Sequence, residues 1–333
     1  MKINPNIIYY EEEALNYSLG KILAEKYKSA EWVRIENHNN IPELRNKHNS
    51  EFANMKQNIV IGIRKTHKYV PNSKTSEFLV PYTSSGCSAM CLYCYLVCNY
   101  NKCSYLRIFV NREQMMDKLI KTSNKSSTDL TFEIGSNSDL VLENTITGNL
   151  DWTIEKFGKN EKGYLTLPSK FDMVSPLLDL EHKGRTIIRI SVNPQEIINK
   201  VEFGTSSLEH RIKALNSLKE AGYKVGILVA PIVLLENWEV LYTELFHILA
   251  DTLSQKVKDE LFFEVIFMTY SYIHRMINTD AFPNAVDLYD KNIMTGRGYG
   301  KYCYNPAIRE KGEELIRFEL TKHFPKNKII YIV

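Results

Sequence analysis

Three cysteines lie within eight residues of one another and are the part of this sequence best suited to chemistry. Cys87, Cys91 and Cys94 follow the spacing C-x3-C-x2-C. Three thiolates can bind three irons of a [4Fe–4S] cube and leave the fourth iron without a protein ligand, whereas clusters that only transfer electrons are usually closed by four cysteines. The spacing therefore predicts a cluster with one open iron that can bind a cofactor.

The cofactor expected at such an iron is S-adenosylmethionine, which would chelate it through its amine and carboxylate. One electron can then break the sulfonium bond and produce a 5′-deoxyadenosyl radical. Residues 86–95 are similar to the cysteine loop of the radical S-adenosylmethionine enzymes. An external one-electron reductant, such as a flavodoxin or a ferredoxin, is expected as a partner.

The cysteines have two alternative uses. Cys98 could complete a four-ligand zinc site, although no second C-x2-C pair follows it. A disulfide framework is disfavoured because five of the six cysteines are crowded between Cys87 and Cys103, which indicates a reducing compartment. A zinc-stabilised nucleic-acid-binding protein without catalytic activity is therefore kept as an alternative.

The overall composition is that of an ordinary globular protein. It is 44% hydrophobic and 24% charged over 333 residues, with no apolar run near the length that a bilayer requires. The N-terminus lacks the apolar segment of a secretory signal, so a cytoplasmic protein without a membrane partner is expected. The net charge of +3 is too small to indicate a polyanionic partner by itself.

From residue 78 onward, short β-rich runs alternate with helical ones. The predicted strands are residues 78–82, 130–134, 164–167, 186–192, 224–229 and 261–266. Six βα units with right-handed crossovers predict an α/β fold, a partial (β/α)6 TIM-like barrel with ligands at the C-terminal strand ends. The cysteine loop would follow the first strand, at the catalytic rim.

Further elements are predicted before and after the barrel in the sequence. Residues 1–76 are predicted to form a small N-terminal α/β module, with a helix over 15–27, strands at 32–35 and 59–63, and a polar loop over 37–50. Residues 77–333 would form the second domain, which ends in a β-hairpin, a helix over 309–323 and a strand over 328–333.

Polar residues at the predicted strand ends are candidate cofactor contacts. Ser138 follows the second strand in a small polar loop, and Lys170 follows the third, where it could meet a carboxylate. On the fourth strand, Arg189, Ser191 and Asn193 share one face, which is costly unless that face lines a site. The fifth strand runs into Ala230 and a proline, an exit suited to an adenine edge.

The segment 296–304 alternates aromatic and basic residues between glycines. Arg297, Tyr299, Lys301 and Tyr302 could stack on bases and neutralise phosphates, a pattern suited to nucleic acid. Such a hairpin could also wedge into a duplex to support an extruded lesion. The alternative is a plain tyrosine-rich hairpin that closes the barrel.

Together these features resemble the spore photoproduct lyase family over residues 77–333. The matching segments are 86–96, Phe132 and Glu133, Ser138 and Asp139, Lys170, 189–193, 202–207, 221–224, 230–232 and 299–302. The resemblance implies a radical S-adenosylmethionine lyase that returns the ultraviolet-induced 5-thyminyl-5,6-dihydrothymine of double-stranded spore DNA to two thymines. It also implies a spore-core location.

In that family the radical removes a hydrogen atom from the lesion, the methylene bridge breaks, a protein thiol returns a hydrogen atom, and the cofactor is regenerated. The residues then expected to contact the cofactor are Tyr93, Ser138, Lys170, Ser191, Asn193 and Ala230. Tyr93 and Tyr95 would also belong to the radical relay that restores it.

One departure from the family concerns the hydrogen donor. Ser136 stands where the family commonly has its donor cysteine, and an alcohol O–H bond is too strong to serve well. We expect Cys98 to be the donor, because it lies on the same loop as the three cluster cysteines and is not needed as a ligand. Cys103 and Cys303 are weaker candidates. A radical S-adenosylmethionine enzyme acting on another substrate is the remaining alternative.

Overall fold

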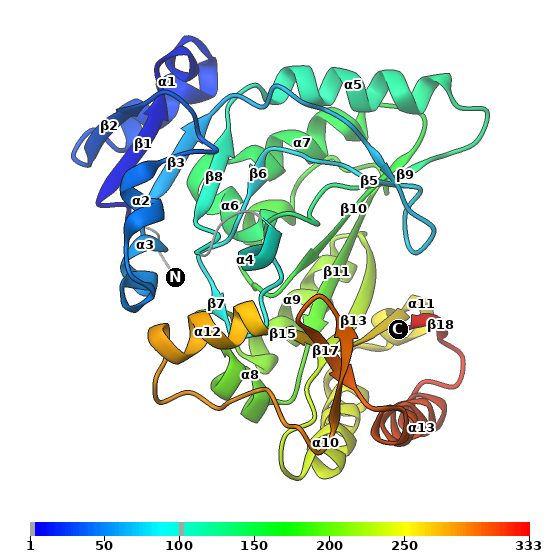
Figure 1. Ribbon diagram of the computed structural model, residues 1–333. Coiled ribbons are helices and arrows are strands. Elements are labelled where there is room, and N and C mark those ends of the chain that lie inside the picture. Colours follow the sequence, from blue (N-terminus) through cyan, green and yellow to red (C-terminus); the bar gives the residue numbers. More distant parts are fainter. Residues whose placement is uncertain (1–3, 100–102) are drawn as a thin grey trace. The chain divides into compact units, whose positions relative to one another are not determined.

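The computed structural model describes residues 4–99 and 103–333 (Figure 1). Contacts between residues divide the chain into two compact units, each of which draws on separate stretches of sequence. The first unit comprises Met1–Met90, Tyr95–Leu167 and Asp179–Thr186. The second comprises Cys91–Cys94, Pro168–Leu178 and Ile187–Val333. The predicted division into two domains, residues 1–76 and 77–333, stays a prediction.

The first unit contains a sheet with the strand order β2-β1-β3-β8-β6. The strands are β1 (Ile7–Glu11), β2 (Glu31–Ile35), β3 (Ile59–Gly62), β6 (Ser84–Ser85) and β8 (Leu106–Phe109). Residues of β3 are buried on both faces, as expected for an apolar run in a parallel sheet. The apolar side of α1 (Ser18–Lys26) joins the same core through Leu19 and Leu23.

Four more strands of this unit carry the start of the predicted βα series. They are β4 (Val70–Pro71), β5 (Phe78–Leu79), β9 (Thr131–Glu133) and β10 (Tyr164–Ser169). The accompanying helices are α2 (Pro42–Asn46), α3 (Phe52–Met55), α4 (Leu96–Asn99), α5 (Arg112–Lys125), α6 (Leu140–Thr147) and α7 (Asn149–Gly158). Asp139 begins α6 by accepting hydrogen bonds from the backbone of Val141 and Leu142, and left-handed Gly148 ends it.

The second unit continues the series with parallel strands in the order β11-β13-β14-β18. These strands are β11 (Thr186–Val192), β13 (Lys224–Ile232), β14 (Phe262–Phe267) and β18 (Lys328–Ile332). Between them run α8 (Gln195–Val201), the short strand β12 (Glu202–Phe203), α9 (Leu208–Glu220), α10 (Trp238–Thr252) and α11 (Gln255–Glu260). Ser207 and Ser254 begin α9 and α11 as N-caps.

A three-stranded antiparallel sheet and two helices complete the second unit. The sheet has the order β15-β17-β16, with β15 (Thr269–Ser271), β16 (Met294–Gly298) and β17 (Lys301–Tyr304). The helices are α12 (Tyr272–Ala281) and α13 (Pro306–His323), and α13 packs against α10 (Figure 1).

Most predicted elements are present with small shifts of their ends. The predicted strand 186–192 coincides with β11, whereas the predicted strand 78–82 is reduced to the two residues of β5. The prediction of a loop over 37–50 was wrong, because that segment contains α2 and a 3-10 turn at Asn49–Glu51. Ile41 and Leu44 are buried there, so two apolar side chains anchor a segment whose composition is otherwise polar.

Candidate active site

The polar face predicted for β11 divides between two environments. Ser191 and Asn193 are buried and enter a hydrogen-bond network at the strand end. Arg189 instead forms an ion pair with buried Glu264, at 3.0 Å between Nη1 and Oε2. Glu264 also accepts a hydrogen bond from Tyr331 of β18. Ser191 and Asn193 therefore lie together in one network, whereas Arg189 links β11 to β14 through its ion pair.

Lys170 follows β10 and belongs to the second unit, where its ammonium group reaches three acceptors. Its Nζ donates to the hydroxyl of Ser191 at 2.6 Å, to the backbone carbonyl of Ala230 at 2.8 Å and to the carboxylate of Glu202 at 3.0 Å. Within the protein its carboxylate partner is thus Glu202, and the predicted contact of Lys170 with the cofactor stays a prediction. Strand ends of three different strands therefore meet around a single ammonium group.

Glu202 is the centre of this network and had no predicted role. Its side chain is fully buried, and it accepts hydrogen bonds from Tyr93, from Asn193 at 2.8 Å and from Arg211 at 2.6 Å. Burial alone would raise the pKa of this carboxyl, but the nearby charges of Lys170 and Arg211 and these hydrogen bonds hold the pKa well below its usual range. Glu202 is therefore a permanent anion that fixes the positions of its partners.

Arg211 is a second member of this network that had no predicted role. Its guanidinium is fully buried and donates to Glu202, to Thr205 and to the backbone carbonyl of Ser191. Leu208, Arg211, Ile212 and Leu215 are buried at helical spacing on one side of α9. An arginine on an apolar stripe of this kind is the sequence signal that could have identified the network.

The lowered pKa of Glu202 predicts a dependence of stability on acid. In the unfolded chain this carboxyl takes up a proton near its ordinary pKa of 4.5, while the folded carboxyl stays ionised at lower pH. Its contribution is thus present above the unfolded pKa and is lost as the pH falls through the folded one. Between about pH 5 and about pH 3, the urea midpoint should fall more steeply in the wild type than in Glu202→Gln. Parallel curves would contradict this assignment.

The phenol of Tyr93 is held in its neutral form. Burial and the adjacent negative charge of Glu202 raise the pKa of Tyr93 well above its usual range. Its hydroxyl donates to Glu202, and the ammonium of Lys170 lies 5.5 Å from the centre of its ring. A tyrosine that keeps its O–H bond in this way can give up a hydrogen atom but not a proton at neutral pH.

The cysteines of the loop are half-buried, and each unit holds part of them. In the first unit, the backbone N–H of Cys87 donates to Ser104 and its carbonyl accepts from buried Lys56 at 2.7 Å. Gly86 precedes it with φ +83°, and a Cβ there would lie 2.0 Å from the carbonyl of Tyr105. Because of this close approach, the position before Cys87 requires glycine.

The other two cysteines of the loop, Cys91 and Cys94, belong to the second unit.

The residues present fit the predicted cluster and cofactor. Three thiols are the donor set of a site-differentiated iron–sulfur cube. In the first unit, Ser138 is buried, and among the described residues its hydroxyl has no hydrogen-bond partner. A buried hydroxyl without a partner is costly unless a ligand satisfies it. Ser138 therefore offers a buried polar group that a ligand could satisfy.

Tyr95 and Ser136 meet within the first unit. The Tyr95 side chain is about half exposed, and its hydroxyl donates to the backbone carbonyl of Ser136. Cys98 lies in α4, where its backbone N–H donates to the carbonyl of Tyr95. Of the other two sulfur candidates, Cys103 is buried and Cys303 lies on β17.

The hairpin predicted at 296–304 is present. Its base is anchored by Tyr304, whose hydroxyl accepts from the backbone N–H of Leu234 at 2.8 Å. Toward the tip, Arg297, Tyr299 and Lys301 are exposed, and Tyr302 packs on Tyr289 with ring centroids 4.7 Å apart. The hairpin thus has an anchored base and an exposed tip.

The comparisons with known proteins agree with this geometry. The sequence model of the spore photoproduct lyase family matches residues 3–333. The chain belongs to this family. Curated spore photoproduct lyases of Bacillus subtilis (strain 168) and Clostridium acetobutylicum are 33% and 31% identical to it, and each alignment covers 98% of both chains.

Solved structures of spore photoproduct lyase are also similar. A double mutant with bound AdoMet and dinucleoside spore photoproduct gives a TM-score of 0.91 at 31% identity, over 99% of both chains. A complex with dinucleoside spore photoproduct gives the same TM-score and identity, over 100% of both chains. The predicted fold, a partial barrel of the radical S-adenosylmethionine type, is confirmed, as is the predicted lyase that repairs the spore photoproduct.

Among the described helices, none is long and apolar enough to cross a membrane.

Proposed function

We propose that this spore photoproduct lyase holds a [4Fe–4S] cluster with S-adenosylmethionine and acts on the lesion in double-stranded DNA. The proposal is carried by the family match over residues 3–333, which includes the cysteine loop. When bound, these groups supply a 5′-deoxyadenosyl radical that removes a hydrogen atom from the lesion. Family membership favours this function over a zinc-stabilised binding protein or a radical enzyme for another substrate.

The residues have distinct roles in this proposal. Cys87, Cys91 and Cys94 would hold three irons. The residues that would contact the cofactor are Tyr93, Ser138, Lys170, Ser191, Asn193 and Ala230. Tyr93 and Tyr95 would belong to the relay that restores the cofactor. The network around Glu202 supports this arrangement, because it orients Lys170, Asn193 and Tyr93 before any ligand arrives.

The test is an anaerobic incubation with dithionite, S-adenosylmethionine and a synthetic dinucleoside spore photoproduct. Recovery of thymine together with 5′-deoxyadenosine would support the proposal. Formation of 5′-deoxyadenosine without thymine would indicate another substrate. A one-electron reductant protein and a spore-core location are further parts of the proposal, supported by the same chemistry rather than by contacts in this chain.

Cys98 is proposed as the hydrogen donor in place of the missing cysteine at position 136. Its thiol S–H would break as a C–H bond forms on the thymine radical. The variant Cys98→Ala should still cleave S-adenosylmethionine, but it should release damaged or adducted thymine products in place of clean repair. Product analysis by chromatography and mass spectrometry distinguishes these outcomes. If Cys98→Ala repairs as cleanly as wild type, the donor lies elsewhere.

The hairpin is proposed as the DNA contact, through Arg297, Tyr299, Lys301 and Tyr302. Reversing both charges with Arg297→Glu and Lys301→Glu should abolish detectable duplex binding at moderate salt. At low salt, residual binding should depend less on ionic strength, with the slope of log K against log salt reduced by about 2. Fluorescence anisotropy with a labelled duplex measures both quantities.

The matched control for the hairpin reverses two charges elsewhere in the second unit. Lys200 and Lys213 are exposed helical lysines that pair with glutamates four residues away. Changing both to glutamate alters the net charge equally and should leave duplex binding close to wild type. An equal loss in the control would show that binding depends on total charge and not on the hairpin.

A further inference from the structure

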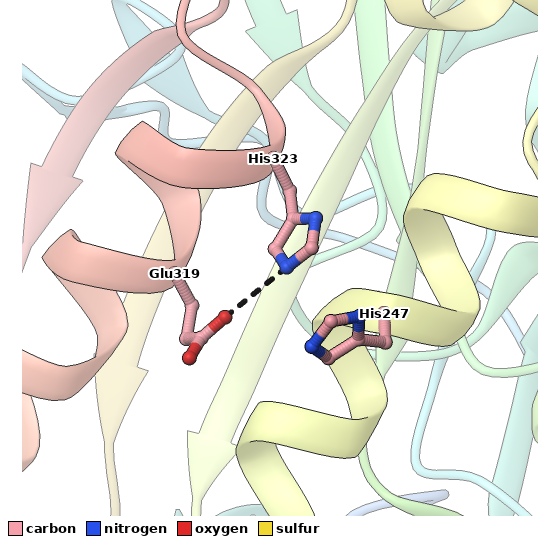
Figure 2. A group of neighbouring side chains, drawn as sticks. All are labelled: His247, Glu319 and His323. Carbon is pink, nitrogen blue, oxygen red and sulfur yellow. Dashed lines mark ion pairs between the residues drawn. The ribbon is translucent and has the colours of Figure 1, made fainter.

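Two histidines and a glutamate meet where α10 packs against α13 in the second unit (Figure 2). His247 comes from α10, whereas Glu319 and His323 are one turn apart on α13 and so lie on the same side of that helix. One ligand atom from each residue lies within 4.8 Å of the others. Neither the cysteine loop nor the network around Glu202 includes any of these three residues.

The polar atoms of this group are arranged in a way that suits a cation. The side chain of Glu319 is only 3% exposed, and Oε2 of Glu319 and Nε2 of His323 have no hydrogen-bond partner among the described residues. These two atoms nevertheless lie 3.2 Å apart, as the ion-pair line in Figure 2 marks. Neighbouring ligands of a tetrahedral zinc ion are about 3.3 Å apart, given bonds of about 2.0–2.1 Å. A separation of 3.2 Å is at the long end of a hydrogen bond and also matches two ligands of one zinc ion.

We propose that His247, Glu319 and His323 bind a divalent metal ion of the zinc class. Two imidazole nitrogens and one carboxylate are a common protein ligand set for Zn²⁺, with water in the fourth position. The exposed side of the site, at His247, leaves room for that water. Such an ion would tie the C-terminal helix α13 to α10 and would neutralise the buried carboxylate of Glu319.

Lys322 is the internal competitor for this site. Its Nζ lies 3.4 Å from Nε2 of His247 and 3.7 Å from Oε2 of Glu319, so it supplies positive charge to the same cluster. The side chain is 43% exposed and can turn toward solvent when a metal binds. Removing the lysine should therefore strengthen metal binding, whereas a cluster satisfied by Lys322 alone should gain no affinity for a metal.

The experiment uses the full-length, tag-free protein with its cluster reconstituted under anaerobic conditions. After equilibration with zinc sulfate and removal of excess metal, iron and zinc are measured in the same sample by mass spectrometry. The wild type should hold one zinc per chain more than His247→Gln, with equal iron in both. His247→Gln should weaken zinc binding by at least about tenfold, and Lys322→Gln should tighten it.

Thermal unfolding gives a second readout and a matched control. Zinc should raise the unfolding midpoint of the wild type and of His210→Gln, which changes an exposed histidine on α9, but not that of His247→Gln. His247 is itself exposed, so its replacement should not unfold the chain. Equal zinc in the wild type and His247→Gln would place the metal at the cysteines or at adventitious sites and would overturn the proposal.

Discussion

Replacing Cys91 by alanine is expected to reduce both 5′-deoxyadenosine formation and thymine recovery to the level of a blank without enzyme. Two thiolates cannot hold the three irons that leave one corner of the cube open. The iron content of the anaerobic protein and its brown absorbance should fall in parallel. Both products are measured by chromatography after reaction with dithionite and S-adenosylmethionine.

Cys303→Ser is the matched control for the loss of iron. Cys303 is also half-buried, but it lies on β17, outside the cysteine loop. This variant should keep the iron content of the wild type and should form 5′-deoxyadenosine at a similar rate. If Cys91→Ala retained iron and cofactor cleavage, the C-x3-C-x2-C spacing would not be the cluster site.

Replacing Arg211 by methionine is expected to lower the free energy of unfolding by about 3–5 kcal/mol, because the buried carboxylate of Glu202 would lose one of its two cationic partners. Cofactor cleavage should also fall, since Glu202 orients Lys170 and Asn193. Urea unfolding followed by circular dichroism measures the first effect, and 5′-deoxyadenosine formation measures the second.

Two further variants separate charge from packing at Arg211. Lys213→Met makes the same kind of change on the exposed side of α9 and should leave the unfolding midpoint unchanged. The double variant Arg211→Met with Glu202→Leu removes both members of the buried pair and should recover part of the lost stability. A double variant less stable than the sum of the single variants would show that the pair is not the source of the effect.

The central strands β11, β13 and β14 could be predicted because each is a short, largely apolar run whose residues are mostly buried. β11 was predicted to the residue, and β13 and β14 within a few residues of their ends. β5 was overestimated, because the ladder is limited to Phe78 and Leu79, with one further backbone hydrogen bond from Val80 to Glu133. Pairing with a partner strand decides where a strand ends, and the partner is distant in sequence.

The cysteine loop and the hairpin could be predicted from the sequence for a different reason. The chemistry of C-x3-C-x2-C depends on three thiols within eight residues, and that of the hairpin on adjacent aromatic and basic residues. Both signals are local, so no knowledge of the fold is needed to recognise them. Cys98 shares this advantage as a candidate donor, because it lies close to the cluster ligands along the chain.

By itself, the sequence determined the cysteine loop, the series of βα units and the family to which they belong, since residue type and short spacing carry all three. Only the tertiary structure decided that Glu202 and Arg211 are one buried ion pair around which Lys170 and Tyr93 are ordered. It also brought His247 beside Glu319, 72 residues later in the chain. The energy of a buried charge depends on what surrounds it in space, and strands and helices far apart in sequence supply those surroundings.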